Sequence, residues 1–370
     1  RLNHLSTQDS AQLVTNLLAT EDCSLALREM IVHKSEGNPF FLEEIIRSLI
    51  DESVLIRNPK TKRWQFTNQV VTANLPDTVQ GIIMTRVDRL EEEAKQVLRM
   101  AAIVGRKFLY RVLRFVAEGD QDLDQILASL QTLELIIEKQ HVPEREYMFK
   151  HGLVQEAIYE SILFRERRHL HVQVGRAIEM LFANRLEEFY SLLAYHYARA
   201  EAWEQAQNYL LKAGDQAGRM AADAEALALY HQALSVSSRV FGSQWDRLQL
   251  ATLERKMGES LYRQGENTRA FEYLQEALTH LGHSLPASIW ATRLVIIREI
   301  IRQIGHRLFS GRYVSQNYGP VDPAIAETGR IYESLVGIGF GINQEKFLMV
   351  VLKSLNFAEV SGFTAGIIHG

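Results

Sequence analysis

Residues 206–213 read Ala-Gln-Asn-Tyr-Leu-Leu-Lys-Ala, and the spacing alanine-x2-large-x3-alanine recurs at residues 226–233 and 270–277. Residues seven apart lie on nearly the same helix face, so the two alanines permit close approach and the large residue fills the neighbouring groove. Stacked hairpins of the tetratricopeptide type pack in this way, with a period of about 34 residues. The intervals here differ from that period, and three ordinary amphipathic helices are the alternative. We predict tetratricopeptide-like repeats over residues 164–370.

Two other regions precede the repeats. Residues 1–74 predict a helix that is capped by Ser6 or Thr7 and runs through Leu18, and further helices over 24–33 and 40–50. They also predict a break at Gly37-Asn38-Pro39 and a short hairpin from 54–56 and 64–66. Residues 75–163 open with a helix start at Pro76-Asp77 and continue with short helices over 91–104, 108–117 and 123–133. Strand-like runs follow at 135–137 and 147–149. Three helices followed by a hairpin predict a winged helix.

The composition is that of a folded globular chain. Its 370 residues are 46% hydrophobic and 23% charged, which excludes a disordered or fibrous protein, and its net charge is −4. The small acidic surplus argues against indiscriminate binding to nucleic acid or membrane surfaces. The single cysteine, Cys23, fits a reducing compartment. No stretch has the roughly 18 apolar residues of a membrane span. The sequence opens at Arg1 without a methionine, and we expect it to be an internal part of a larger cytoplasmic protein.

Motifs for common catalytic chemistries are missing from the sequence. No glycine is followed by lysine, which excludes a Walker A phosphate loop, and neither His-Glu-x-x-His nor Gly-x-Ser-x-Gly occurs. The close histidine pairs, His169 with His171 and His280 with His283, have no carboxylate at obvious ligand spacing. We therefore predict no catalytic residue and no metal site within this chain.

Several segments together resemble one family. Gly37-Asn38-Pro39-Phe40-Phe41-Leu42-Glu43-Glu44-Ile45 is similar to a segment of the STAND branch of AAA-type ATPases, and so are residues 75–80, 86–90 and 149–159. Arg167-Arg168-x-Leu170-His171 resembles the segment that opens the family's repeats. Residues 270–285 and 355–359 most resemble members fused to class III adenylate or guanylate cyclase domains, or to protein kinases. The family's Walker A and Walker B elements would lie before Arg1.

The resemblance covers essentially the whole chain and implies its organisation. The fold is expected to be mainly α, with a helical lid and a winged-helix segment followed by a tetratricopeptide-like α-solenoid. Residues 1–74 would be the helical lid of the ATPase module with its short hairpin, and residues 75–163 the winged-helix-like domain. Residues 164–370 would be the repeats.

The resemblance also implies three nucleotide-binding residues. In the family, the Gly-x-Pro turn places its proline against adenine, which would be the role of Pro39, while Gly37 allows close backbone approach. A winged-helix histidine, here His151, would donate a hydrogen bond to the β-phosphate of ADP. The alternatives are a turn that only joins two helices, and a capping or partly buried structural histidine. We expect ATP or ADP in the full-length protein and none on this fragment alone.

Three functions from different classes remain open at this stage. The first is the regulatory region of a STAND ATPase, which would couple a protein or small-molecule effector on the repeats to intramolecular ATPase and output domains, a cyclase among them. The second is a free-standing helical-repeat scaffold for protein partners, and the third is the sensor region of a transcriptional regulator. Direct nucleic-acid binding is not expected. The basic cluster at residues 165–171 adjoins the predicted winged helix, but the predicted third helix has no Lys or Arg.

Overall fold

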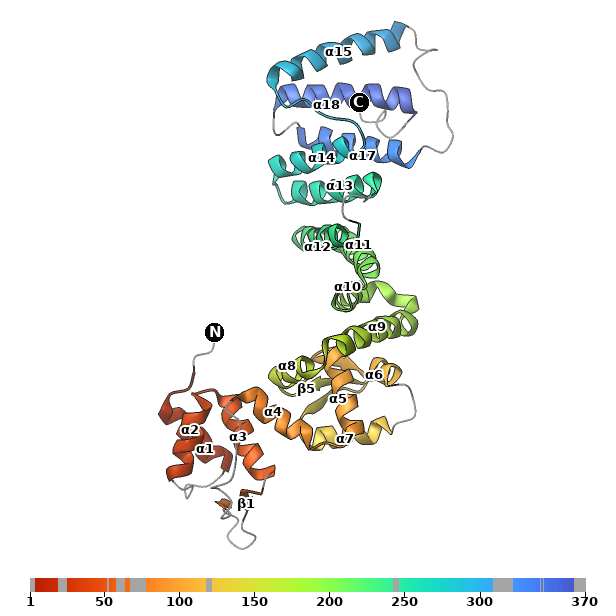
Figure 1. Ribbon diagram of the computed structural model, residues 1–370. Coiled ribbons are helices and arrows are strands. Elements are labelled where there is room, and N and C mark those ends of the chain that lie inside the picture. The colour runs from red at the N-terminus through yellow and green to blue at the C-terminus, as the bar shows by residue number, and fades with distance from the viewer. Residues whose placement is uncertain are drawn as a thin grey trace. The chain divides into compact units, whose positions relative to one another are not determined.

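The computed structural model describes residues 4–18, 25–51, 53–57, 64–66, 78–117, 122–241, 246–308, 322–339, 341 and 343–362. Contacts divide the chain into two compact units, Arg1–Leu181 and Phe182–Gly370. Figure 1 shows a few short strands in the first unit and helices throughout the second. The predicted mainly α fold is therefore confirmed. The predicted division at residues 74 and 163 stays a prediction.

The first unit begins with three helices and a small hairpin. These are α1 (Thr7–Leu18), α2 (Leu25–Ser35), α3 (Pro39–Asp51), β1 (Leu55–Arg57) and β2 (Trp64–Phe66). The hydroxyl of Ser6 accepts a hydrogen bond from the Asp9 amide at 3.1 Å, as expected of a helix cap. The helices enclose an apolar core that includes Val14, Ile31, Leu42, Ile45 and Leu55. The predicted helix start at Pro76-Asp77 lies outside the described residues.

The described residues of the rest of the first unit form six helices and a three-stranded sheet. Its elements are α4 (Val79–Asp88), α5 (Glu92–Val104), β3 (Lys107–Leu109), α6 (Tyr110–Val116), α7 (Leu123–Thr132), β4 (Ile136–Gln140), β5 (Glu146–Phe149), α8 (Gly152–Ser161) and α9 (Phe164–Leu181). The sheet is antiparallel with the order β3-β5-β4, and Phe108 pairs with Tyr147. The predicted hairpin of β4 and β5 is confirmed. The helix predicted from residue 108 begins at Tyr110, because residues 107–109 pair with β5 instead.

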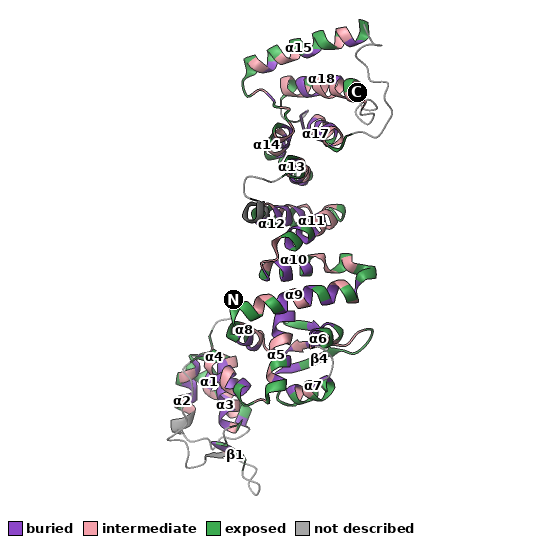
Figure 2. Ribbon diagram, turned by 45° about the vertical axis from the view of Figure 1, so that its right-hand side comes forward, coloured by how far each residue is buried: buried purple, intermediate pink, exposed green. Residues whose placement is uncertain are grey.

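The second unit is built from packed helices. They are α10 (Tyr190–Arg199), α11 (Trp203–Arg219), α12 (Asp223–Phe241), α13 (Arg247–Arg263), α14 (Asn267–His280), α15 (Ile289–Leu308), α17 (Pro323–Gly339) and α18 (Gln344–Ser361), with a 3-10 helix over Ala183–Phe189. Consecutive helices pack as α10 on α11, α11 on α12 and α13 on α14. The helix α15 instead packs on α18 (Figure 2). No helix in the described part of the chain is long and apolar enough to cross a membrane.

A small residue and a large residue sixteen positions later define the repeat. A methyl group on Gly214 would lie 2.5 Å from the Tyr230 ring, and one on Gly258 would lie 2.9 Å from Leu274 Cγ. Ala194 and Leu210, both buried, have the same spacing on α10 and α11. The three hairpins therefore share one small-to-large register, as in tetratricopeptide repeats.

The small-to-large register corrects which residue faces the small one, and it explains the short interval between the first two copies of the alanine pattern. The small residue faces a residue one position after the predicted one, as Gly214 faces Tyr230 and Gly258 faces Leu274. The predicted Tyr209 and Leu229 are also buried, whereas Tyr273 is half-buried. The helix α11 carries Leu210 for the hairpin with α10 and Gly214 for the hairpin with α12. Because one helix serves two hairpins, the first two copies of the alanine pattern lie closer together than a full repeat.

Candidate functional site

The Gly37-Asn38-Pro39 turn is fixed by contacts within the chain itself. Gly37 has φ of +75°, and its carbonyl oxygen accepts a hydrogen bond from the Leu5 amide at 2.8 Å. A methyl group on Gly37 would lie 2.5 Å from the Leu5 carbonyl oxygen. Asn38 Oδ1 accepts from the Phe40 amide at 3.0 Å, and the exposed Pro39 is the first residue of α3. The backbone that approaches Gly37 is therefore that of Leu5.

His151 lies beside the same turn, although more than 100 residues separate the two in sequence. Its ring packs on Phe40 with centroids 4.4 Å apart, and Phe40 directly follows Pro39. His151 is the N-cap residue of α8, but its side chain makes no capping hydrogen bond. Its Nε2 atom is buried and has no hydrogen-bond partner among the described residues. The structure thus brings Pro39 and His151 to one place, while Gly37 contacts Leu5 instead.

The charges around His151 come mainly from α3. Burial lowers the pKa of the His151 imidazole below its ordinary value of 6.5, against an opposing effect of Glu43 and Glu44. The ring is therefore neutral near pH 7 and has one N–H to donate. A neutral donor suits a hydrogen bond to an anionic oxygen without adding a full charge to a partly buried site.

Ion pairs join α3 to the sheet next to His151. Glu134, just before β4, pairs with both Lys150 and Arg47. These two cations, with Lys150 contributing most, lower the pKa of Glu134 to about 2. Lys150 directly precedes His151, and Arg47 also binds Glu43 at 2.7 Å. Sequence reasoning did not find these pairs because their partners come from separate elements.

A buried ion pair also connects α3 to α4. Arg86 Nη1 lies 2.6 Å from Glu44 Oε2, and the two side chains are 8% and 3% exposed. Arg86 Nη2 donates to the Leu133 carbonyl oxygen at 3.0 Å, at the end of α7. Arg86 and Glu44 both belong to segments that carry the family resemblance, which was the available signal. Their role in the structure is to join α3, α4 and α7.

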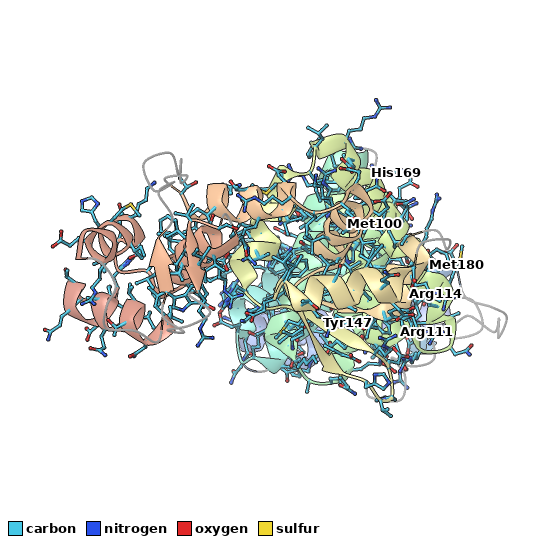
Figure 3. The ribbon with its side chains drawn as sticks, turned by 90° about the horizontal axis from the view of Figure 1, so that it is seen from below. Met100, Arg111, Arg114, Tyr147, His169 and Met180 are labelled. Atoms are coloured by element: carbon cyan, nitrogen blue, oxygen red, sulfur yellow. The ribbon has the colours of Figure 1, made fainter. Side chains whose placement is uncertain are left out.

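The basic cluster at residues 165–171 makes contacts within the first unit. Tyr159 OH lies 3.1 Å from His171 Nε2, and the Arg167 guanidinium lies 5.1 Å from the centre of the Tyr159 ring. The predicted third helix, now α7, has no Lys or Arg in its ten residues. Two exposed arginines, Arg111 and Arg114, lie instead on α6 (Figure 3). The described residues contain no group of three His, Cys, Asp or Glu placed to hold a metal ion.

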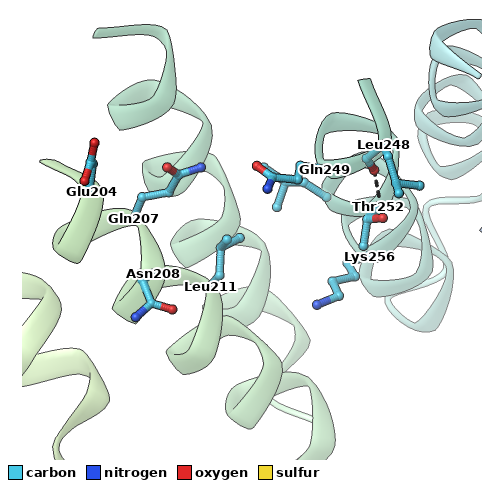
Figure 4. Close-up of a pocket in the computed structure, with 9 residues that line it drawn as sticks. Glu204, Gln207, Asn208, Leu211, Leu248, Gln249, Thr252 and Lys256 are labelled. Atoms are coloured by element: carbon cyan, nitrogen blue, oxygen red, sulfur yellow. Dashed lines mark hydrogen bonds between the residues drawn. The ribbon is translucent and has the colours of Figure 1, made fainter. Parts of the chain in front are cut away.

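A polar groove of about 450 Å³ lies in the second unit between α11 and α13 (Figure 4). The side chains of Glu204, Gln207, Asn208 and Leu211 line it from α11. Those of Leu248, Gln249, Thr252, Leu253 and Lys256 line it from α13. Lys256 Nζ also binds Asp215 Oδ1 at 2.6 Å. The groove therefore offers amide groups on both sides and one hydroxyl, that of Thr252, and the charges of Glu204 and Lys256 are opposite.

No protein-family model matches the chain. Two curated proteins are similar to parts of it. A hybrid signal transduction histidine kinase G of Dictyostelium discoideum is 23% identical over 201 residues, which cover 44% of this chain and 6% of that protein. An uncharacterized protein of Rhizobium meliloti is 26% identical over 209 residues, which cover 56% of this chain and 19% of that protein. The chain thus spans less than a fifth of either relative.

The similar solved structures include one that agrees with the whole chain only at a low level. It is a Signal Transduction ATPase with Numerous Domains (STAND) protein with a tetratricopeptide repeat sensor, from Pyrococcus horikoshii. The identity is 13% and the TM-score is 0.32, and the match covers 99% of this chain and 62% of that one.

Proposed function

We propose that this chain is the regulatory region of a multidomain STAND-type signalling ATPase. In this proposal the first unit supplies the helical lid and a winged helix of the ATPase module, and the second unit supplies the sensor repeats. The order of the motifs supports the assignment, and so does the three-helix, three-strand arrangement of residues 92–149. A histidine kinase relative is compatible with an output domain elsewhere in the polypeptide. Cyclase or kinase output remains part of the proposal.

The observation that carries the proposal is the contact of His151 with Phe40, next to Pro39. Two stretches that resemble nucleotide-contacting motifs come together there, and His151 Nε2 has no hydrogen-bond partner in the described part of the chain. A buried polar atom left unpaired costs about 1–3 kcal/mol, so a partner in another state of the protein would stabilise that state. A phosphate oxygen of ADP is such a partner. Because Nε2 is covered here, the imidazole must move relative to Phe40 to reach it.

The residues present fit part of a nucleotide site. Pro39 offers an exposed apolar ring that would contact the base, and His151 would donate to a phosphate oxygen. Gly37, in this proposal, shapes the turn through Leu5 and has no direct contact with the nucleotide. The Walker A and Walker B elements would come from residues outside this chain. Residues 1–370 alone should therefore show no measurable ATP turnover. They should also show no micromolar affinity for ATP when binding is measured by calorimetry.

The test is the release of a fluorescent ADP analogue from the full-length protein. If His151 donates a hydrogen bond worth about 2 kcal/mol to bound ADP, His151→Ala should speed release about 30-fold. Pro39→Ala should weaken nucleotide binding with less effect on switching. The exposed His169 provides the matched control, because His169→Ala should leave release unchanged. Unchanged ADP release in His151→Ala, at normal thermal stability, would make His151 a structural residue.

The groove between α11 and α13 is the proposed effector site of the repeats. Its facing amides, Gln207 and Asn208 on one side and Gln249 on the other, can pair with the backbone of an extended peptide or with a polar small molecule. The transcriptional-regulator reading is less well supported, because α7 offers no cation to a phosphate backbone.

A further inference from the structure

The helix α15 exposes large apolar side chains along its whole length. Seven of them lie between 53 and 75% exposed. Beside Ile289, six of these form one row, Trp290, Leu294, Ile297, Ile301, Ile304 and Leu308. Such a continuous apolar surface marks an interaction site, because single exposed apolar residues are normal but long rows of them are not.

The opposite face of α15 is packed, with polar residues at its buried positions and with Val295 and Ile296 partly buried against the apolar core. Thr292, Glu299 and His306, each seven residues apart, are buried where α15 packs on α18. Asn356 Nδ2 donates to Glu299 Oε2 at 3.0 Å, and His306 Nδ1 lies 2.7 Å from Glu359 Oε2. The helix therefore docks through these polar contacts together with Val295 and Ile296, and its apolar row stays exposed among the described residues.

The spacing of the exposed row identifies the shape of its partner. The six residues alternate at intervals of four and three, which is the a/d pattern of a heptad repeat. They occupy a stripe about 80° wide at 3.6 residues per turn, which is the width of a coiled-coil seam. A second α-helix with its own apolar heptad fits this seam by knobs-into-holes packing.

The charges beside the seam define the chemistry of that helix. Arg293 and Arg307 flank it at g positions and Arg298 at an e position, and Arg302 lies further round the helix. Glu299 is the single acidic residue of α15, and both Arg298 and Arg302 share its carboxylate, at 2.8 and 3.5 Å. Arg293 also pairs with Glu345 of α18 at 2.8 Å. Four arginines against these two carboxylates leave the rim of the seam with a net positive charge. We propose that α15 docks an amphipathic helix of a partner protein, with an apolar heptad seam and acidic residues at its flanking positions.

Neither a second copy nor a membrane fits as well. An antiparallel pair of α15 helices would place Arg298 beside its own copy and Arg293 beside Arg307, and a parallel pair would place Arg293 beside Arg298. These like charges oppose self-association. A helix that lies in a membrane interface presents its polar face to water, whereas the polar face of α15 is packed on α18.

The test uses residues 1–370 and a labelled peptide of three heptads with Ile at a, Leu at d and Glu at e and g. Fluorescence anisotropy should show saturable binding that weakens as salt increases. The double variant Leu294→Ser/Ile301→Ser should bind at least about tenfold more weakly. The matched control is Leu163→Ser/Met220→Ser, whose two side chains are equally exposed elsewhere, and it should bind like the wild type.

The charge reversal Arg298→Glu/Arg307→Glu separates the acidic helix from other occupants. It should lose the Glu peptide and gain an otherwise identical peptide with Lys at e and g. Absence of seam-dependent binding to the Glu peptide would overturn the proposal. Seam-dependent binding to phosphatidylserine vesicles would replace it with a membrane, and seam-dependent dimerisation in sedimentation would replace it with a second copy. Binding by residues 1–370 but not by a longer natural polypeptide would mean that the protein covers its own seam.

Discussion

Replacing Arg86 by methionine should destabilise the first unit strongly, because it leaves the buried carboxylate of Glu44 without its cation. Removal of one member of a buried pair costs about 3–5 kcal/mol. Glu44→Leu should cost less, about 2 kcal/mol, since Arg86 keeps the Leu133 carbonyl at 3.0 Å and Asp51 at 3.3 Å. The double variant Arg86→Met/Glu44→Leu removes both charges and leaves the Leu133 carbonyl unpaired, so about 1–2 kcal/mol should be lost. The double-mutant cycle should therefore report a coupling of several kcal/mol.

Urea unfolding can measure this in the first unit alone. Trp64 is the one tryptophan of that unit, and it packs against the core formed by α1, α2 and α3. With Trp203, Trp245 and Trp290 changed to phenylalanine, fluorescence reports the unfolding of the first unit. Arg89→Met is the matched control, because Arg89 follows the same helix but is exposed, and it should cost less than about 1 kcal/mol. A cost below about 1 kcal/mol for Arg86→Met, or additive costs in the double variant, would refute the reasoning.

Two further predictions concern the second unit. Gly214→Ala should destabilise the protein by about 1–3 kcal/mol, because its methyl group would meet the Tyr230 ring. Gly337→Ala should stabilise it by up to about 1 kcal/mol, because Gly337 lies within α17 and no atom stands where its methyl group would go. Circular dichroism during thermal unfolding compares the two variants. Burial, assisted by the charge of Glu276, raises the pKa of Glu254 from 4.5 to about 8, although His280 lies 3.3 Å away. Between these two pH values the carboxyl group is protonated in the folded protein and ionised in the unfolded chain. Stability should fall across that range by up to about 1.4 kcal/mol per pH unit and Glu254→Gln should remove this dependence, so an unchanged slope in urea unfolding at pH 5.5, 6.5 and 7.5 would contradict the assignment.

Local patterns in the sequence were sufficient to predict most of the helices. The cap at Ser6, the proline at the start of α3 and the apolar period of α5 act within one turn of helix, so a window of a few residues contains the cause. The strand β3 was missed because three residues carry little period, and its pairing with β5 is decided by residues about 40 positions away. The residue that faces the small one was placed one position early for a related reason. Its partner, such as Gly214 for Tyr230, lies on the preceding helix.

The candidate site was predictable as residues but not as an arrangement. A motif identified Pro39 and His151, yet nothing in the motif places the imidazole on Phe40. The ion pairs Arg86 with Glu44 and Glu134 with Lys150 connect elements that are separate in sequence, and charged residues on amphipathic helices are usually solvated. Their pairing depends on which helix faces which, and this follows only from the packed structure.

The helix α15 shows why an apolar period alone does not say which face of a helix is covered. A segment with Trp290, Leu294, Ile297 and Ile301 in heptad register would ordinarily be assigned a core on that side. In the described part of the chain the opposite face is the packed one, because Glu299 and His306 have specific partners on α18 while the apolar row stays more than half exposed. Hydrogen-bonded partners fix the orientation of α15 strongly, since turning the helix over would leave buried charges unpaired. The apolar side must then face either water or another helix, and its cost in water is the physical reason to expect the latter.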